Sequence, residues 1–213
     1  MKKLIAFMCA IALVCTMTAS VLANVSISDL VPTVGEVTVE QKVELPEKAK
    51  IIVEPVASTG ENWSGNVTEK VVAVNSTEES TTVAELVVAL AELPANDKLT
   101  VKEGVLEIKD EEGNVVSELN VAEADFASVF SEVYLSDGAT VTYDDDGKAI
   151  SVELSLTYEQ LRGRSAEEFQ ILLINPETGE MTLIDLDPSS FNAETGEITI
   201  KFPFLGVFAL IEK

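Results

Sequence analysis

The stretch Ile171 to Leu186, ILLINPETGEMTLIDL, decides the fold of this chain. Two apolar runs stand on either side of Asn175-Pro176-Glu177-Thr178-Gly179, a turn that begins with Asn and ends with Gly. Asn forms local hydrogen-bonded turns, and Gly readily adopts the left-handed backbone conformation that closes a short hairpin loop. The stretch therefore predicts two antiparallel strands joined by a tight turn.

The same turn chemistry recurs along the chain. Asn192-Ala193-Glu194-Thr195-Gly196 nearly repeats the first turn and precedes the apolar run Ile198 to Phe202. Two shorter turns, Asp110-Glu111-Glu112-Gly113 and Asp144-Asp145-Asp146-Gly147, place Asp first and Gly fourth. Apolar, β-branched runs flank each of them, as in a hairpin with a three-residue loop. Four hairpin turns therefore indicate a chain built mainly from antiparallel strands.

The segment from Ile150 to Leu156 alternates apolar and polar residues. Ile150, Val152, Leu154 and Leu156 recur with a period of two, which is typical of a strand with one buried face. Together with the turns, this pattern predicts that residues 139–213 form an antiparallel meander.

One helix is clearly expected, at Val83 to Leu93, where apolar residues follow helical spacing. Thr82 and Glu85 form a capping box, and Pro94 ends the element. Residues 121–135 could form a second helix, although Ser128 to Tyr134 fits a strand equally well. The predicted fold class is mainly β (α+β), an antiparallel β-sandwich-like meander with one or two helices.

The domain organisation follows from these elements. Residues 24–78 are a looser N-terminal β-rich region, with short apolar runs at Ile51 to Val53 and Val71 to Val74. Residues 79–213 form the β-sandwich-like domain with the helix 83–93. Whether residues 24–78 are a separate subdomain stays open.

The first 23 residues resemble a secretory signal peptide. Lys2 and Lys3 are followed by the apolar run Leu4 to Val14, which is too short to span a bilayer, and Val21-Leu22-Ala23 is a small-residue cleavage site. The short cationic start favours a bacterial protein that is secreted, either released or associated with the cell wall, with no membrane span after cleavage. Cys15 as a lipid anchor is the alternative, which the large Val14 before it disfavours.

Composition limits the chemistry. The chain has 14 basic and 37 acidic residues, a net charge of −23, and no histidine. Such a charge repels nucleic acid and anionic lipid. Both cysteines, Cys9 and Cys15, leave with the signal peptide. The mature chain therefore lacks the residues for a Ser-His-Asp triad, a Cys-His pair or a His- or Cys-ligated zinc. The composition still allows catalysis by a pair of carboxylates, as in glycosidases.

Two binding sites are candidates. Asp144, Asp145 and Asp146 could supply oxygen ligands to Ca²⁺. They do not form an EF-hand, because Gly147 at its sixth position would place Thr142 where an acid is required. An ordinary exposed hairpin tip is the alternative. Trp63, the single tryptophan, could stack on a sugar ring from its polar loop, or could instead fill the core.

Arg162-Gly163-Arg164 is a tight basic group. We interpret it as a surface loop whose charges are offset by the nearby residues Glu159, Glu167 and Glu168.

The C-terminal pattern resembles a known type of module. Phe169 to Ile174, the two Asn-to-Gly turns, Gly196 to Phe202 and the ending Leu205 to Ile211 are similar to the C-terminal β modules of secreted Firmicutes proteins of largely unknown function. The resemblance covers residues 121–213, although Gly206-Val207 stands where those modules have Ser-Pro. It implies a noncatalytic extracellular β module and transfers no functional residues.

These patterns together favour a secreted, noncatalytic β-rich module with a binding or structural role at or outside the bacterial cell surface. Its expected partners are cell-envelope or host proteins and glycans. The alternatives are a carboxylate-based glycan-active enzyme and a calcium-stabilised adhesion domain. No cofactor is expected other than Ca²⁺ in the last case.

Overall fold

Strands dominate the described residues, which confirms the expected mainly β, α+β fold class with antiparallel sheets; α3 is the α-helix whose bounds the described residues give. The computed structural model describes residues 30–39, 50–56, 71, 81–110, 112–136, 151–175 and 178–213. The elements in chain order are β1 (Thr33–Val39), β2 (Ile51–Pro55), α3 (Val83–Ala91), β3 (Leu99–Lys102), β4 (Val105–Lys109), β5 (Val115–Asn120), β6 (Asp125–Phe126), β7 (Ser131–Leu135), β8 (Val152–Thr157), β9 (Phe169–Ile174), β10 (Met181–Asp185), β11 (Phe191–Asn192), β12 (Glu197–Phe202) and β13 (Val207–Glu212). Short 3₁₀ helices cover Pro94–Asn96, Glu159–Leu161, Ala166–Glu168 and Pro188–Ser190.

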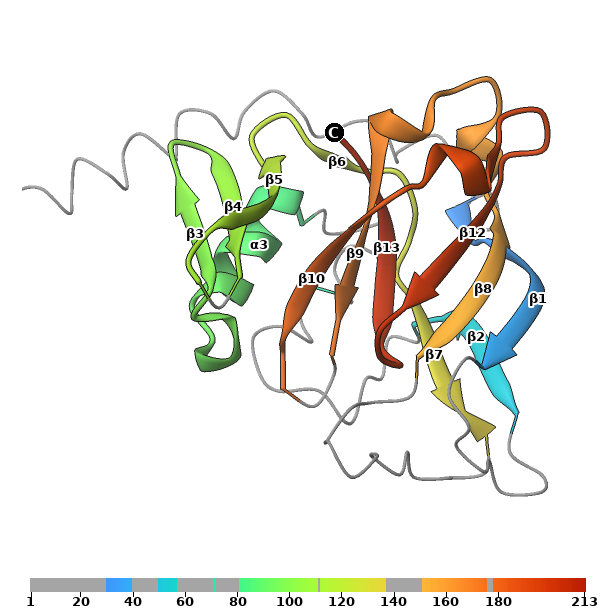
Figure 1. The fold of residues 1–213 in the computed structure, drawn as a ribbon, viewed down its shortest axis with the longest axis horizontal. Helices are drawn as coiled ribbons and strands as arrows, with labels where there is room; N and C mark the ends of the chain where they lie inside the picture. The colour runs from blue at the N-terminus through green and yellow to red at the C-terminus, as the bar shows by residue number, and fades with distance from the viewer. Residues whose placement is uncertain are drawn as a thin grey trace, which may run out of the picture.

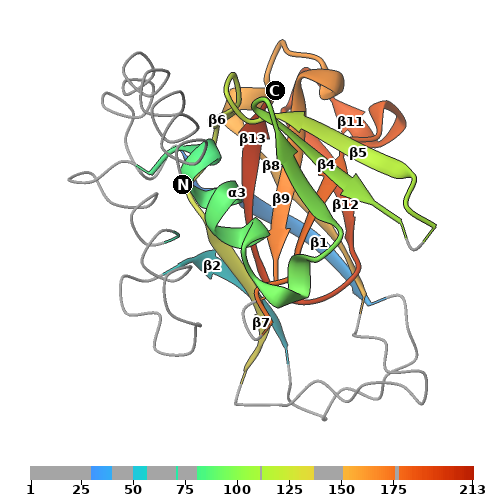
Figure 2. The same ribbon diagram turned by 90° about the vertical axis from the view of Figure 1, so that its left-hand side faces the viewer.

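The strands form three sheets that stack in layers (Figure 1). The outer sheet has the order β1-β8-β12-β11, and the central sheet has the order β10-β9-β13-β7-β2, with β6 paired to β13. The third sheet, β3-β4-β5, lies with α3 on the other side of the central sheet (Figure 2). The central sheet is therefore covered on both faces.

The apolar sequences of the strands in the central sheet explain why this sheet lies between two other layers. All six residues of β9 are buried, and so are the first five residues of β13. A strand with one face in water alternates polar and apolar residues, whereas a strand covered on both faces reads as a continuous apolar run. Strand β8 of the outer sheet shows the first pattern, with Val152, Leu154 and Leu156 buried and the residues between them partly exposed.

Two apolar clusters hold the layers together, one on each face of the central sheet. The cluster facing the outer sheet joins, among others, Leu154, Leu156, Phe169, Ile171, Ile200, Phe202, Phe208 and Leu210. The cluster on the other face joins, among others, Leu86, Val87, Leu90, Leu106, Leu119, Leu172, Ile174 and Ala209. Neighbouring residues of β9 thus belong to different clusters.

Helix α3 begins as the sequence predicts. Glu85 N donates to Thr82 Oγ1 at 3.2 Å, and Thr82 N donates to Glu85 Oε2 at 3.1 Å. This capping box satisfies backbone donors that the first helical turn leaves without partners. The helix ends at Ala91, and Pro94 starts the following 3₁₀ helix.

Asn96 ties this helical region to the central sheet. Its side chain is 3% exposed, and its Nδ2 donates to Leu90 O and to Gly179 O at 2.8 Å each. Met181 N donates to Asn96 Oδ1 at 2.9 Å. One buried amide therefore connects the end of α3 with the turn between β9 and β10.

Residues 121–135 allowed two structures, a helix or, over Ser128 to Tyr134, a strand; the strand is confirmed and the helix is wrong. This segment contains β6 and β7, and β7 pairs with β2 and β13. Asn120 closes a turn before β6, in which Ala124 N donates to Asn120 O. Ser131, Val133 and Leu135 are buried at a period of two. The local apolar pattern fits both structures, and pairing with two strands distant in the sequence selects the strand.

Three of the predicted hairpins have both strands in the described residues and are confirmed, but the order of the strands in the sheets differs from the meander predicted for residues 139–213. β4–β5, β9–β10 and β11–β12 are antiparallel pairs. However, β8 pairs with β1 and β12, and β9 pairs with β10 and β13. The chain therefore changes sheets after β8, after β10 and after β12. Turn chemistry determines a hairpin, whereas the sheet that a hairpin joins depends on which apolar faces meet. The turn at 144–147 lies outside the described residues.

The two described strands of the N-terminal region join the layers of the rest of the chain. β1 pairs with β8 at one edge of the outer sheet, and β2 pairs with β7 at one edge of the central sheet.

The two copies of the five-residue turn have the same hydrogen bonds. Gly179 N donates to Asn175 O, and Gly196 N donates to Asn192 O, each at 2.8 Å. Both glycines have positive φ, 74° and 72°. A Cβ atom at Gly196 would overlap the carbonyl oxygen of Tyr158, whereas one at Gly113, where φ is 85°, would meet no atom within 4 Å.

We expect Gly196→Ala to destabilise the protein far more than Gly113→Ala. Both substitutions force alanine into the left-handed region, at a cost of about 1–2 kcal/mol. The overlap at Gly196 requires a displacement of packed backbone, which adds about 2 kcal/mol. Urea unfolding of both variants measures the difference. Equal losses would contradict the close packing of this turn against the end of β8.

Candidate functional site

The residues singled out by the sequence as binding sites, Trp63 and Asp144 to Asp146, lie outside the described residues, as do residues 1–23. Among the residues that are described, no group of three or more His, Cys, Asp or Glu side chains is placed to hold a metal ion. None of the described helices has the length and apolar character needed to cross a membrane. Three groups of polar side chains remain as candidates.

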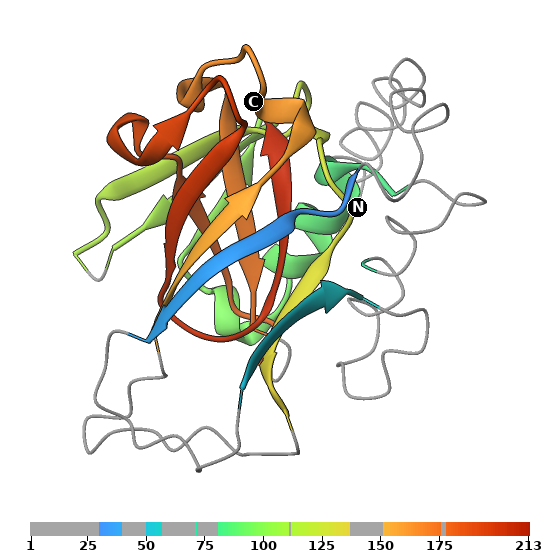
Figure 3. The same cartoon turned by 90° about the vertical axis from the view of Figure 1, so that its right-hand side faces the viewer.

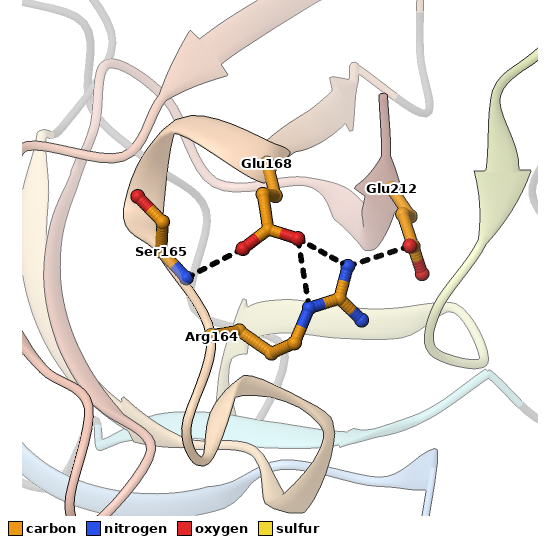
Figure 4. A network of polar contacts seen from close by, with 4 residues as sticks. All are labelled: Arg164, Ser165, Glu168 and Glu212. Atoms are coloured by element: carbon orange, nitrogen blue, oxygen red, sulfur yellow. Dashed lines mark hydrogen bonds and ion pairs between the residues drawn. The ribbon is translucent and has the colours of Figure 1, made fainter.

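The first group surrounds Arg164, before β9 (Figure 4). Arg164 Nε and Nη2 donate to Glu168 Oε2 at 2.9 and 2.6 Å, and Nη2 also donates to Glu212 Oε1 at 2.6 Å. Its guanidinium lies 4.8 Å from the centre of the Phe169 ring, within cation–π range. The other oxygen of Glu168 accepts from Ser165 N at 2.7 Å.

These contacts make the Arg164 group a structural connection. Hydrogen bonds from Arg164 and Ser165 lower the pKa of Glu168 below its ordinary value. Lys213 N donates to Glu168 O at 2.8 Å, so the end of the chain is attached to the same 3₁₀ helix. The Nε and Nη2 donors of Arg164 are held by two carboxylates, and its guanidinium lies over an aromatic ring. These contacts connect the end of β13 with the start of β9.

The expected neutralisation of the Arg162-Gly163-Arg164 group is confirmed for two of its acids. Arg162 Nη2 lies 3.1 Å from Glu159 Oε1, and Arg164 is paired with Glu168. The pairing with Glu212 was not predicted, because 48 residues separate it from Arg164. Only the antiparallel pairing of β13 with β9 brings them together.

The second group lies on β2 and β7 and contains two glutamates directly opposite each other. Glu54 is the register partner of Glu132, and Ile52 is the partner of Tyr134. Tyr134 Oη donates to Glu54 Oε1 at 2.7 Å. Val133 and Leu135 point into the cluster that faces the outer sheet, so Glu132 and Tyr134 lie on the opposite face of the central sheet.

The two glutamates have different surroundings. Burial, and secondarily the charge of Glu54, raises the pKa of Glu132 above its ordinary value. Glu54 is exposed and accepts the tyrosine hydroxyl. Side chains directly opposite in an antiparallel pair have Cβ atoms about 5 Å apart. Two opposed glutamates, one of them more readily protonated, are the residue types that carboxylate-based glycoside hydrolysis uses.

No sequence signal pointed to this pair. Glu54 and Glu132 come from segments 78 residues apart by their numbers, and the chain offers 37 acids from which to choose. Only the register of β2 against β7 selects these two.

The third group covers the solvent-facing side of the outer sheet, which we call the hydroxyl face (Figure 3). The pairing of β1, β8 and β12 aligns its side chains in three rows across the sheet. The rows are Thr33, Thr157 and Glu197; Ser155 and Thr199; and Thr38, Glu153 and Lys201. All of these residues are exposed or partly exposed, and Ser155 Oγ donates to Glu197 Oε1 at 2.6 Å.

The hydroxyl face presents hydrogen-bonding groups at regular spacings across and along its strands. Neighbouring strands in a sheet are about 4.8 Å apart, and residues two apart along a strand are separated by about 6.7 Å. Serine and threonine hydroxyls both donate and accept, so they match ligands that do the same. The carboxylates of Glu153 and Glu197 within the face disfavour anionic ligands.

Comparison with known proteins gives no further assignment, because no family model, no curated protein and no solved structure matches the chain. The three groups of polar side chains and the sequence patterns are therefore the features that bear on function.

We expect Glu132→Gln to stabilise the protein at pH 7 and to have little effect near pH 4. A carboxyl whose pKa is raised by folding contributes stability below its unfolded pKa, and this contribution is lost as the pH rises through the folded pKa. Glutamine avoids the loss because it carries no charge at either pH. Melting temperatures at both pH values measure the effect, with Glu123→Gln in an exposed turn as the control. A lower melting temperature of Glu132→Gln than of the unmodified protein at pH 7 would contradict the described surroundings of Glu132.

Proposed function

We propose that this protein is a secreted, noncatalytic β-rich module that has a binding or structural role at or outside the bacterial cell surface. The observation that carries the binding role is the hydroxyl face, which is polar and turned to solvent. The sequence supports the location through the Lys2-Lys3 start, the apolar run and the small-residue site before Asn24.

An uncharged glycan of the cell envelope or of a host is the ligand that best fits the hydroxyl face. Sugar hydroxyls pair with the threonine and serine hydroxyls of the three rows, each as donor or acceptor. A net charge of −23 repels anionic polymers, including nucleic acid. A rigid sheet supplies the platform, because β8 and β12 are held from behind by the apolar cluster against the central sheet.

A carboxylate-based glycan-active enzyme is the second candidate, and the opposed pair of Glu54 and Glu132 favours it. In that case Glu132, whose pKa is raised, would be the proton donor, and Glu54 would be the nucleophile or base. Tyr134 would orient Glu54 through its hydroxyl.

We expect the chain from Asn24 onward to bind insoluble cell-wall fractions or neutral host glycans, and Thr157→Ala combined with Thr199→Ala to weaken this binding about tenfold. The two hydroxyls contribute about 0.5–1.5 kcal/mol each, and 1.4 kcal/mol corresponds to a factor of ten. Co-sedimentation across a concentration series gives the affinity. Thr100→Ala with Thr182→Ala, partly exposed threonines of the other two sheets, is the matched control. Equal weakening by both pairs, or no glycan capture, would contradict binding through this face.

We also expect no hydrolysis of a broad panel of glycans and peptides. Turnover that is lost in Glu132→Gln or Glu54→Gln, but retained in the control Glu123→Gln, would establish the enzyme instead and end the noncatalytic proposal. The release of reducing sugar and of free amines measures the two activities directly.

A further inference from the structure

Strand β5 is an outer strand whose free edge carries exposed apolar side chains. It pairs with β4 on one side and is the last strand in the order β3-β4-β5. Val115 and Val116 have exposed fractions of 44% and 61%. These are the two highest values among the exposed large apolar side chains of the described residues. Exposed valines on a strand edge are unusual, because valine favours the interior.

The backbone of β5 is available for a further strand. In an antiparallel pair, every second residue directs its N–H and C=O away from its partner, so half of these groups in an outer strand face outward. Within the described residues, no strand pairs with β5 on that side. The register shift between Ile108 and Lys109 also places Val116 at a bulge, which turns it outward.

One acidic side chain at this edge, Glu118, has no ion pair within the described part of the chain. Glu107 on β4 has lysine neighbours, with Lys109 Nζ at 3.4 Å and Lys102 Nζ at 3.9 Å. Glu118 lies directly opposite Glu107 on β5 and is exposed. A second copy of this chain, with its net charge of −23, is disfavoured as the partner. A basic segment is favoured.

We propose that β5 binds an extended, positively charged polypeptide segment, which adds to the β3-β4-β5 sheet as a fourth strand. Its backbone pairs with the outward groups of β5, its apolar side chains contact Val115 and Val116, and a Lys or Arg pairs with Glu118. This site is separate from the hydroxyl face and does not depend on the function proposed for that face.

The test uses a labelled nine-residue peptide of alternating Lys and Val, titrated with the protein and followed by fluorescence anisotropy. A second peptide has the same side chains, with every second backbone amide N-methylated. Strand addition requires these N–H groups, whereas general electrostatic attraction does not. We expect the N-methylated peptide to bind at least about tenfold more weakly.

Two variants locate the site, and each has a matched control on α3 or at its end. Val116→Ser and Glu118→Lys are expected to weaken peptide binding about tenfold. Val88→Ser alters another exposed valine, and Glu92→Lys makes the same change in charge at an exposed position. We expect these two controls to change the affinity less than about twofold. Circular dichroism confirms that each variant is folded.

Three results would overturn the proposal. The first is the absence of binding by the unmodified peptide. The second is equal binding of the N-methylated peptide, and the third is equal weakening by a control and its matched variant, because both indicate diffuse attraction to an acidic protein.

Discussion

The structure depends on the burial of both faces of one sheet. β9 and β13 run side by side in the central sheet, and their alternate residues enter two different apolar clusters. Each cluster holds one outer layer in place. Removing apolar surface from water stabilises the folded chain by roughly 25 cal/mol for each Å² buried, and this sheet buries such surface on both faces. Both cysteines lie in the expected signal peptide, so the stability of the mature chain depends on this burial.

The polar groups are arranged around this apolar framework. Asn96 attaches the helical layer to the β9–β10 turn, and Arg164 attaches the end of β13 to the segment before β9. Both side chains have several partners, as is required of polar groups placed near an apolar core. The groups proposed to bind partners have a different setting. The hydroxyl face and the edge of β5 lie on the outer layers, where their donors and acceptors remain in contact with solvent.

The two surfaces also differ in the chemistry they offer. The hydroxyl face presents side chains on the broad side of a sheet whose strands are paired with one another, so the recognition proposed there would rely on hydroxyls and a few charges. The edge of β5 offers backbone groups first, with Val116 and Glu118 adding apolar and electrostatic selectivity. The net charge of −23 acts on both surfaces, because it repels anions and attracts cations.

The sequence by itself determined the strand content, the hairpins β4–β5, β9–β10 and β11–β12, the capped start of α3 and the pairing of Arg162 with Glu159, because each depends on residues close together in the chain. Tertiary structure alone decided that residues 121–135 contain strands and that the chain changes sheets after β8, after β10 and after β12. It also decided that Glu54 meets Glu132 and that Arg164 meets Glu212. Turn and capping preferences act over about five residues. Register and layer order are decided by apolar faces that meet across the whole chain, and no local pattern encodes them.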